Sequence, residues 1–326
     1  MSRVDKGIVG AATRKPIVPI GFRLRSVARR VRRHWQLYAL LSLPLLWLII
    51  FAYGPMYGLQ IAFRDFNVTG GITDSPFVGL KQFERYISSF DFWQTLGNTV
   101  YLSIYSLLAG FPFPILLALG LHYTARRWFK NTVQMVTYAP YFISVVVVAG
   151  MLLQFLAPNT GPVNQILQAL GLAPVNFMAK PEWFGHIYVW SGVWQTIGFG
   201  AVLYLAALTG VDPALHEAAI VDGASKLQRV RYIDLPALVP LAVVLLILSV
   251  GTALSTGFEK VLLLQNPLNI RASEVIDTYV YRVGLASTVP NYSYAAAIGL
   301  FKSAVGLILV VVVQRFAKRA GQEGAF

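Results

Sequence analysis

The chain has 326 residues, of which 56% are hydrophobic and only 13% are charged, yet its formal net charge is +13. Soluble domains have about 45–50% apolar and about 25% charged residues. The composition excludes a disordered tail protein, and the absence of cysteine excludes a disulfide scaffold and thiolate metal sites. The histidines are too scattered in the sequence to indicate a metal cluster, so we expect no metal site; they are His34, His122, His186 and His216.

Long apolar segments follow one another along the chain, and each is long enough to cross a bilayer. Inside them Lys302 is the single ionised side chain, a pattern that the buried helices of a soluble protein do not produce. The sequence therefore predicts an all-α integral membrane protein with six transmembrane helices. The predicted spans are 37–59, 97–123, 132–157, 186–210, 237–256 and 295–314.

The charges of the connecting segments predict the orientation of the spans. Residues 1–36 carry ten Lys or Arg and one acid, and alternate connections continue this bias, so that one side holds 19 cations and 6 acids and the other 7 cations and 8 acids. The more cationic side is cytoplasmic by the positive-inside rule, and both termini lie there. The net charge is then a topology signal, and no nucleic-acid partner is needed to explain it.

These boundaries divide the chain into a basic cytoplasmic segment (1–36), a six-span domain (37–314) and a cytoplasmic tail (315–326). Two interpretations of the basic segment remain open. It either lies as a partly helical stretch on anionic membrane lipids, or it is a disordered tail that only orients the first span.

The fourth connection, residues 211–236, has the pattern of a short capped helix followed by a turn. Asp212 is a good N-cap, Pro213 occupies the favoured first helical position, and Gly223 suits a left-handed C-terminal turn. Alanines leave one helix face flat, so another protein can approach the backbone there, and Glu217 projects from that surface. The alternative is a short helix on the membrane surface that merely closes a hairpin.

The loop also carries a long, gapped motif: Glu217-Ala218-Ala219, then Gly223, Ile233 and Leu235-Pro236. At this spacing it resembles the EAA signature of binding-protein-dependent ABC transporter permeases. The resemblance implies a type I, maltose-permease-like permease fold and a coupling helix that docks into a cleft of a cytoplasmic ATPase. It assigns that contact to Glu217, Ala218, Ala219, Asp222, Gly223 and Ala224, and the return into the fifth span to Ile233, Leu235 and Pro236.

Other segments are similar to the carbohydrate-uptake permeases of this family, which import oligo- or polysaccharides: YGPMYGLQIAFRDFN (53–67), APYFIS (139–144) and DTYVYRVGL (277–285). The resemblance covers about residues 37–314, and within the subfamily it extends to the first permease subunits of bacterial alginate importers.

This resemblance implies alternating access in the cell inner membrane, with a second permease subunit that forms a heterodimer and two ATP-binding cassette subunits. It also implies a periplasmic solute-binding protein that docks on residues 60–96 and 257–294. ATP and Mg²⁺ would be bound by the ATPase, and no cofactor by this chain.

Missing motifs favour the same interpretation. The sequence has no G-x-x-x-x-G-K-[ST] loop to hold nucleotide phosphates, and it has no hydrolase or metalloprotease motif. ATP hydrolysis is therefore expected in another subunit, and we predict that this chain is not an enzyme. The alternative is a stand-alone secondary carrier or channel for a small solute, which the absence of paired carboxylates within the spans disfavours.

Sugars are recognised by aromatic faces and hydrogen bonds, so aromatic and polar residues within the spans are candidates for the substrate path. Two alternatives remain open. Trp190 could belong to the aromatic belt at the membrane interface, and the small hydroxyl residues could serve helix packing. Lys302 either faces the path and favours an anionic chain, or snorkels to the surface, or pairs with Glu259. The predicted path residues are Trp190, Trp194, Gln195, Asn98, Tyr101, Thr252, Thr256 and Lys302.

Overall fold

The computed structural model describes residues 33–253 and 257–319, and its regular elements in those ranges are helices. The predicted all-α class is confirmed. Most of the predicted basic segment 1–36, the predicted path residue Thr256 and the end of the tail lie outside the described residues. The chain divides into two compact units, residues 1–59 and 60–326, which are taken separately below.

The first unit is a long apolar helix. It begins with α2 (Trp35–Trp47), continues through a π-helical stretch η1 (Leu48–Tyr53) and ends in α3 (Gly54–Met56). None of these residues is buried, and the apolar helical stretch extends to Phe63 through the 3-10 helix η2 (Tyr57–Phe63). An apolar helix of 29 residues is long enough to span a bilayer, and it exceeds the predicted span 37–59 at both ends.

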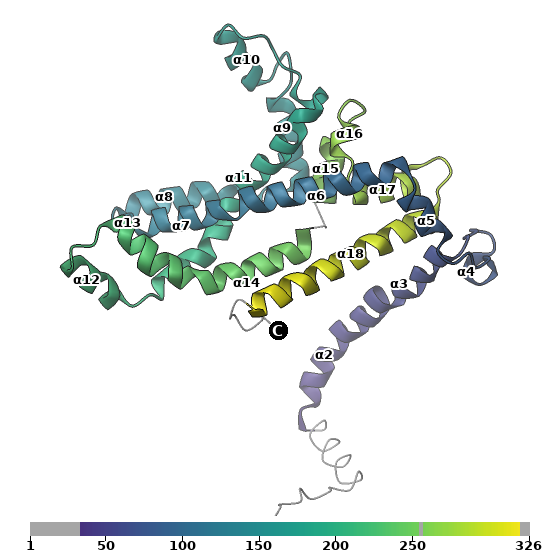
Figure 1. Cartoon of the computed structure of the whole chain (residues 1–326), viewed down its shortest axis with the longest axis horizontal. Helices are drawn as coiled ribbons and strands as arrows, with labels where there is room; N and C mark the ends of the chain where they lie inside the picture. Colours follow the sequence, from purple (N-terminus) through teal and green to yellow (C-terminus); the bar gives the residue numbers. More distant parts are fainter. Residues whose placement is uncertain (1–32, 254–256, 320–326) are drawn as a thin grey trace, which may run out of the picture. The chain divides into compact units, whose positions relative to one another are not determined.

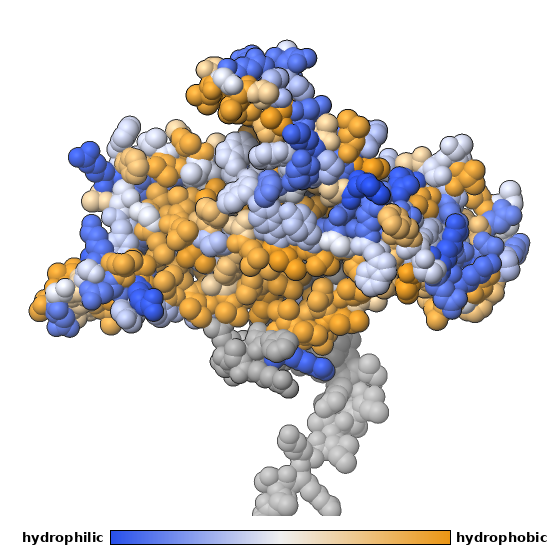
Figure 2. Space-filling model, turned by 45° about the horizontal axis from the view of Figure 1, so that its top comes forward, coloured by the Kyte–Doolittle hydropathy of each residue, from blue (hydrophilic) through white to orange (hydrophobic). Residues whose placement is uncertain are grey.

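Four further continuous helical stretches are long and apolar enough to cross a membrane, which makes five in the described residues. Figure 1 shows the second unit as long helices that run side by side, and Figure 2 shows hydrophobic residues gathered over their middle. The stretches are Phe90–His122, formed by α6 (Phe90–Gly110) and α7 (Pro112–His122), Pro181–Thr209 (α11), Lys226–Gly251, formed by α13 (Lys226–Arg229), η5 (Val230–Asp234) and α14 (Leu235–Ala253), and the main part of α18 (Tyr292–Arg319).

The third predicted span is not one straight helix, and this corrects the expectation for residues 132–157. Helix α8 (Arg127–Tyr138) with η3 (Ala139–Phe142) meets α9 (Val145–Phe155) at an angle of 101°. Pro140 lacks a backbone donor, Ile143 has extended backbone, and Ser144 caps the new helix by accepting from Val147 N. The bent pair counts as a sixth span only when its two halves are taken together.

Helix α11 is central to the second unit and packs against α6, α7, α8 and α14. Two of its glycines permit close approach: Gly198 lies against the backbone of Thr137 in α8, and Gly185 lies against the ring of Tyr101 in α6. A side chain at Gly198 would collide with backbone, which cannot move aside. Helices α8 and α11 are therefore in direct backbone contact.

Short helices connect these long ones. Helix α5 occupies Lys81–Ile87, and Glu274 and Val275, which have extended backbone, separate α16 from α17. The short elements are α4 (Gly71–Asp74), α5 (Lys81–Ile87), α10 (Pro162–Ala169), η4 (Phe177–Ala179), α12 (Pro213–Val221), α15 (Phe258–Leu264), α16 (Ile270–Ser273), α17 (Ile276–Tyr281) and η6 (Arg282–Ala286).

Candidate coupling and translocation sites

The capped helix predicted in residues 211–236 is present as α12. Asp212 Oδ1 accepts from Ala214 N at 2.9 Å, Pro213 is the first helical residue, and Gly223 has a φ of +77°. The N–H of Ala224 donates to Ala219 O at 2.8 Å, which closes the helix in the manner of a Schellman turn. Figure 1 shows α12 apart from the packed long helices.

A second cap begins the return into the membrane. Ser225 Oγ accepts from Gln228 N at 3.4 Å, and the Gln228 side chain accepts from Ser225 N at 2.7 Å, which forms a capping box. The turn between α12 and α13 is thus fixed by hydrogen bonds of its own residues.

The buried carboxylate of Asp234 lies where α12 meets the ends of the long helices. Asp234 is fully buried in η5; its Oδ2 accepts from the Tyr123 hydroxyl at 2.6 Å, and its Oδ1 lies 3.3 Å from His216 Nε2 of α12. Burial, with a further contribution from the carboxylate, raises the pKa of Tyr123 to about 12, so the phenol keeps its proton and donates it. Residues of α12, of η5 and of the end of α7 therefore meet at one acid, through a hydrogen bond from Tyr123 and a close contact with His216.

Two of the four histidines meet at this acid, which their sequence spacing does not reveal. Donor atoms of His122, His216 and Asp234 all lie within 4.8 Å of one another, and this is the one such group of three among residues 33–253 and 257–319. Two imidazoles and a carboxylate are a donor set of the kind that Zn²⁺ accepts. Asp234 Oδ2 accepts from Tyr123, whereas Asp234 Oδ1 and His216 Nε2 are buried and have no hydrogen-bond partner among the described residues.

The residues assigned to ATPase contact lie mostly on the open side of this loop. Glu217, Ala218, Asp222 and Gly223 are exposed, whereas Ala219 is half-buried. Large apolar side chains accompany them on α12 and the following turn: Leu215 (54% exposed), Ile220 (55%), Val221 (86%) and Leu227 (77%). An acid amid exposed apolar side chains indicates a surface for another protein. Of the remaining assigned residues, Ala224 and Ile233 are half-buried, and Leu235 and Pro236 are exposed at the start of α14.

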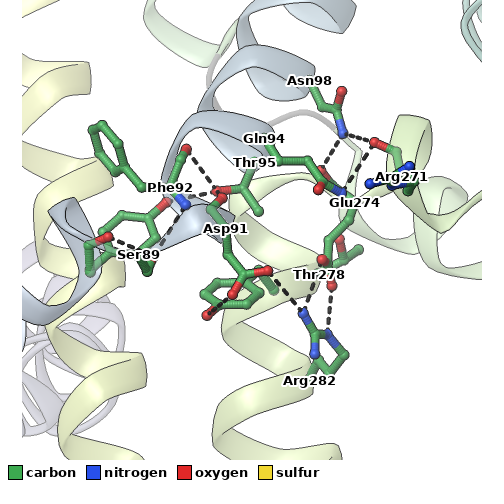
Figure 3. Close-up of polar contacts among 12 residues, drawn as sticks. Ser89, Asp91, Phe92, Gln94, Thr95, Asn98, Arg271, Glu274, Thr278 and Arg282 are labelled. Carbon is green, nitrogen blue, oxygen red and sulfur yellow. Dashed lines mark hydrogen bonds and ion pairs between the residues drawn. The ribbon is translucent and has the colours of Figure 1, made fainter.

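At the opposite end of the helices, polar side chains form what we call the distal network (Figure 3). Asn98 Nδ2 of α6 donates to the carbonyl oxygens of Arg271 and Glu274, both at 2.9 Å. The Glu274 carboxylate accepts from Arg282 at 2.6 and 3.0 Å, and these hydrogen bonds raise the pKa of the Arg282 guanidinium. Predicted path residue Asn98 thus ties α6 to the segment between α16 and α17.

Lys302 of α18 also bonds to this end of the molecule. Its ammonium donates to both carboxylate oxygens of Asp277 in α17, at 2.6 and 2.7 Å. The partner of Lys302 is therefore Asp277 and not Glu259, the pairing considered from the sequence. The two side chains are 16% and 25% exposed, so the pair is only partly covered by protein.

A cavity of about 420 Å³ lies between four of the long helices. One stripe of α11 lines the cavity with Tyr188, Thr196, Gly200 and Tyr204, and these positions span about 24 Å at 1.5 Å per residue. That length approaches the roughly 30 Å of a hydrocarbon core. The rest of the lining comes from α6, α7, α14 and the junction between α6 and α7, and includes Ser103, Ser106, Gly110, Phe111, Pro114, Leu245 and Ser249.

Among the predicted path residues whose side chains the structure describes, none lines this cavity. Trp190 and Trp194 stand on a different face of α11; Trp190 Nε1 donates to the Tyr105 hydroxyl at 2.9 Å. Gln195 Nε2 donates to Ile143 O at the break between α8 and α9, at 2.9 Å. Tyr101 packs on Gly185, and Thr252 lies in α14. Their roles in substrate passage stay predictions.

The α11 side of the cavity follows a regular pattern in the sequence. Residues 188, 192, 196, 200 and 204 share an i, i+4 row, and two of the five are glycine. A search for aromatic side chains selects the opposite row with Trp190 and Trp194, because aromatic residues in a span serve packing as well as binding. In α11, the face that lines the cavity is the one where glycines alternate with residues that carry hydroxyl groups, and not the face with the two tryptophans.

Comparison with known proteins agrees with this geometry. Residues 110–322 match the family described as "Binding-protein-dependent transport system inner membrane component". The chain is 41% identical over 290 residues to the polygalacturonan/rhamnogalacturonan transport system permease protein YteP of Bacillus subtilis (strain 168), covering 89% of this chain and 90% of that protein. It is 39% identical over 311 residues to protein LplB of the same organism, covering 95% and 97%.

Among solved structures, it is similar to a chain of "a bacterial ABC transporter involved in the import of the acidic polysaccharide alginate", with a TM-score of 0.84 and 40% identity. The match covers 90% of this chain and 99% of that one. A complex of the bacterial alginate transporter with a pentasaccharide-bound periplasmic protein matches equally well, also at a TM-score of 0.84. The chain therefore belongs to the inner membrane components of binding-protein-dependent transport systems, as a multi-pass, non-catalytic permease of a sugar or polysaccharide ABC importer.

Proposed function

We propose that this permease forms one half of the pathway of an ATP-driven importer of an oligo- or polysaccharide, with alginate as the first candidate substrate. A periplasmic binding protein delivers the saccharide, and a second, non-identical permease subunit completes the path. Two ATPase subunits bind ATP and Mg²⁺, this chain holds no cofactor of its own, and both termini lie in the cytoplasm. Relatives named for polygalacturonan and alginate transport support an acidic substrate.

The observation that carries this proposal is the way α12 is presented. Its exposed face combines Glu217 with apolar side chains, while His216 on the same helix lies against Asp234 at the root of α14. A partner that moves α12 therefore also acts on Asp234 of η5 and on Tyr123 at the end of α7, which donates to that acid. Closure of the ATPase dimer on ATP binding moves the long helices in this way, and hydrolysis resets them.

The test uses the assembled importer in proteoliposomes with its binding protein. Glu217→Lys reverses the exposed charge, and Gly223→Asp places a side chain at a φ of +77°, which L-residues seldom adopt. Both variants are expected to keep basal ATP hydrolysis and to lose at least about tenfold in saccharide-stimulated hydrolysis and uptake, equivalent to about 1.4 kcal/mol of coupling free energy. Normal stimulation in both variants would overturn the role of the loop.

A matched control reverses an exposed charge elsewhere. Glu182→Lys lies in the first turn of α11, remote from α12, and is exposed. It is expected to leave stimulated hydrolysis at the wild-type level. Transport by the isolated chain, without an ATPase subunit, would instead support a stand-alone carrier or channel.

A further inference from the structure

Lys260 in α15 is a buried cation without a carboxylate partner among the described residues. Only 7% of the residue is exposed, and no ion pair found in the described ranges includes it. Its ammonium donates to Tyr188 O at 3.0 Å and lies 5.1 Å from the centre of the Tyr188 ring. Two of its three N–H donors thus have no hydrogen-bond partner among these residues.

Burying an unpaired charge is costly, and proteins rarely retain one without a counter-ion. Burial lowers the pKa of Lys260 to about 8, which still leaves most molecules charged at pH 7. The other buried charged side chains of the described residues differ in this respect. Glu274 is paired with Arg282, and Asp234 is bonded by Tyr123.

The ammonium lies beside the row of α11 that lines the cavity, although neither Lys260 nor Gly192 is itself among the lining residues. A β-carbon added at Gly192 would be 3.5 Å from Lys260 Nζ. Gly192 stands in the same row of α11 as Tyr188 and Thr196, both of which line the cavity. The cation therefore lies beside the half of this row that is remote from α12, and Gly192 places no side chain between the ammonium and the row.

We propose that Lys260 is an anion-recognising residue of the translocation path, which receives the carboxylate groups of an acidic saccharide as the chain enters the cavity. The inference rests on the proposed function. A carboxylate supplies the negative charge that Lys260 lacks, and the ammonium has donors left to bond it. The lining hydroxyls of Tyr188, Thr196 and Tyr204 then hydrogen-bond the hydroxyl groups of a sugar chain.

The experiment compares two probes in proteoliposomes that contain the assembled importer and its binding protein: an oligogalacturonate and its carboxyl-reduced counterpart. Uptake is measured at saturating binding protein, so that affinity for that protein does not set the rate. Lys260→Met keeps a long side chain without charge, and Lys260→Arg keeps the charge. We expect Lys260→Met to lower oligogalacturonate uptake about tenfold and to change uptake of the reduced probe less than twofold, while Lys260→Arg retains most of the acidic uptake.

Equal loss of both probes in Lys260→Met would show a packing role and overturn the proposal, as would equal retention of both. Gly192→Ala is a second variant that does not depend on the fold of α15. Its methyl group fits at ordinary contact distance from Nζ, and it is expected to reduce acidic uptake selectively. Complex assembly and basal ATP hydrolysis are measured for each variant. Wild-type importer that takes up neither probe nor an alginate oligosaccharide with ATP would overturn the proposed function itself. Normal wild-type uptake with no selective loss in Lys260→Met would overturn only the role of Lys260.

Discussion

The two ends of the second unit are held in different ways. In the distal network, α6 is bonded to the α16–α17 segment by amide, hydroxyl and carbonyl groups, and Lys302 adds an ion pair from α18. At the α12 end, the contacts converge on the single carboxylate of Asp234. Contacts shared among many groups make a rigid end, whereas contacts that converge on one acid let α12 move as a unit. The α12 end is thus suited to receive a moving partner.

Among the changes that test this difference between the two ends, removal of the Asp234 carboxylate is expected to have the largest effect. Asp234→Ala deletes the acceptor of Tyr123 and the neighbour of His216, and hydrogen bonds to charged groups contribute about 1.5–3 kcal/mol. We expect ATPase subunits to co-purify at least about tenfold less with this variant. Asp234→Asn keeps an oxygen acceptor and should lose less. Wild-type co-purification of Asp234→Ala would show that α12 has another anchor.

Lys302→Met tests the distal end. It leaves Asp277 without its cation, and because both side chains are partly exposed we expect a loss of only about 1 kcal/mol in unfolding free energy. Thermal denaturation of the purified importer measures this loss. The exchanged pair, Lys302→Asp with Asp277→Lys, should recover it. A selective loss of acidic saccharide uptake with unchanged stability would instead place Lys302 in the path.

Two amides of the same network give a smaller, graded comparison. Asn98 donates two hydrogen bonds of 2.9 Å to the carbonyl groups of Arg271 and Glu274, whereas Gln94 donates one of 3.2 Å to Arg271. At about 0.5–1.5 kcal/mol for each hydrogen bond, Asn98→Ala should lower the denaturation temperature by about twice as much as Gln94→Ala. Equal decreases in denaturation temperature would mean that the stability contribution depends on where the residue lies on α6, and not on how many hydrogen bonds it donates.

The smallest expected effect is at the capping box of α13. Ser225→Ala removes the acceptor for Gln228 N and should cost about 0.5–1 kcal/mol of local stability. Hydrogen exchange over residues 225–229 should accelerate several-fold while exchange in the distal network stays unchanged. Ser225→Asn, which retains a capping oxygen, is the control. Acceleration at both ends would contradict the independence of the two regions.

Local features of the coupling loop were predictable from sequence because they depend on neighbouring residues. The roles of Asp212, Pro213 and Gly223 follow from capping and backbone chemistry, and the structure confirms all three. The apolar helices were likewise predictable from length and composition. The break at Ile143 was missed, although Pro140 and Ser144 are its signals, because prolines are common inside membrane helices and do not always bend them.

Contacts between distant residues were not predictable in the same way. Nothing in the sequence brings His122 to His216 or selects Asp277 over Glu259 as the partner of Lys302, since these meetings depend on how helices pack. The face of α11 that lines the cavity was not predictable for the same reason. The prediction chose the face with Trp190 and Trp194, and the cavity lies along another face.

The glycine contact between α11 and α8 has a mechanical consequence. Helix α11 ends at Thr209 and α12 begins at Pro213, so a displacement of α12 is transmitted to α11 through a very short connection. With Gly198 seated on the backbone of Thr137, α11 cannot slide along α8 without separating from it. The two helices should therefore travel as one rigid body, and force applied at α12 would be delivered to the corner between α8 and α9.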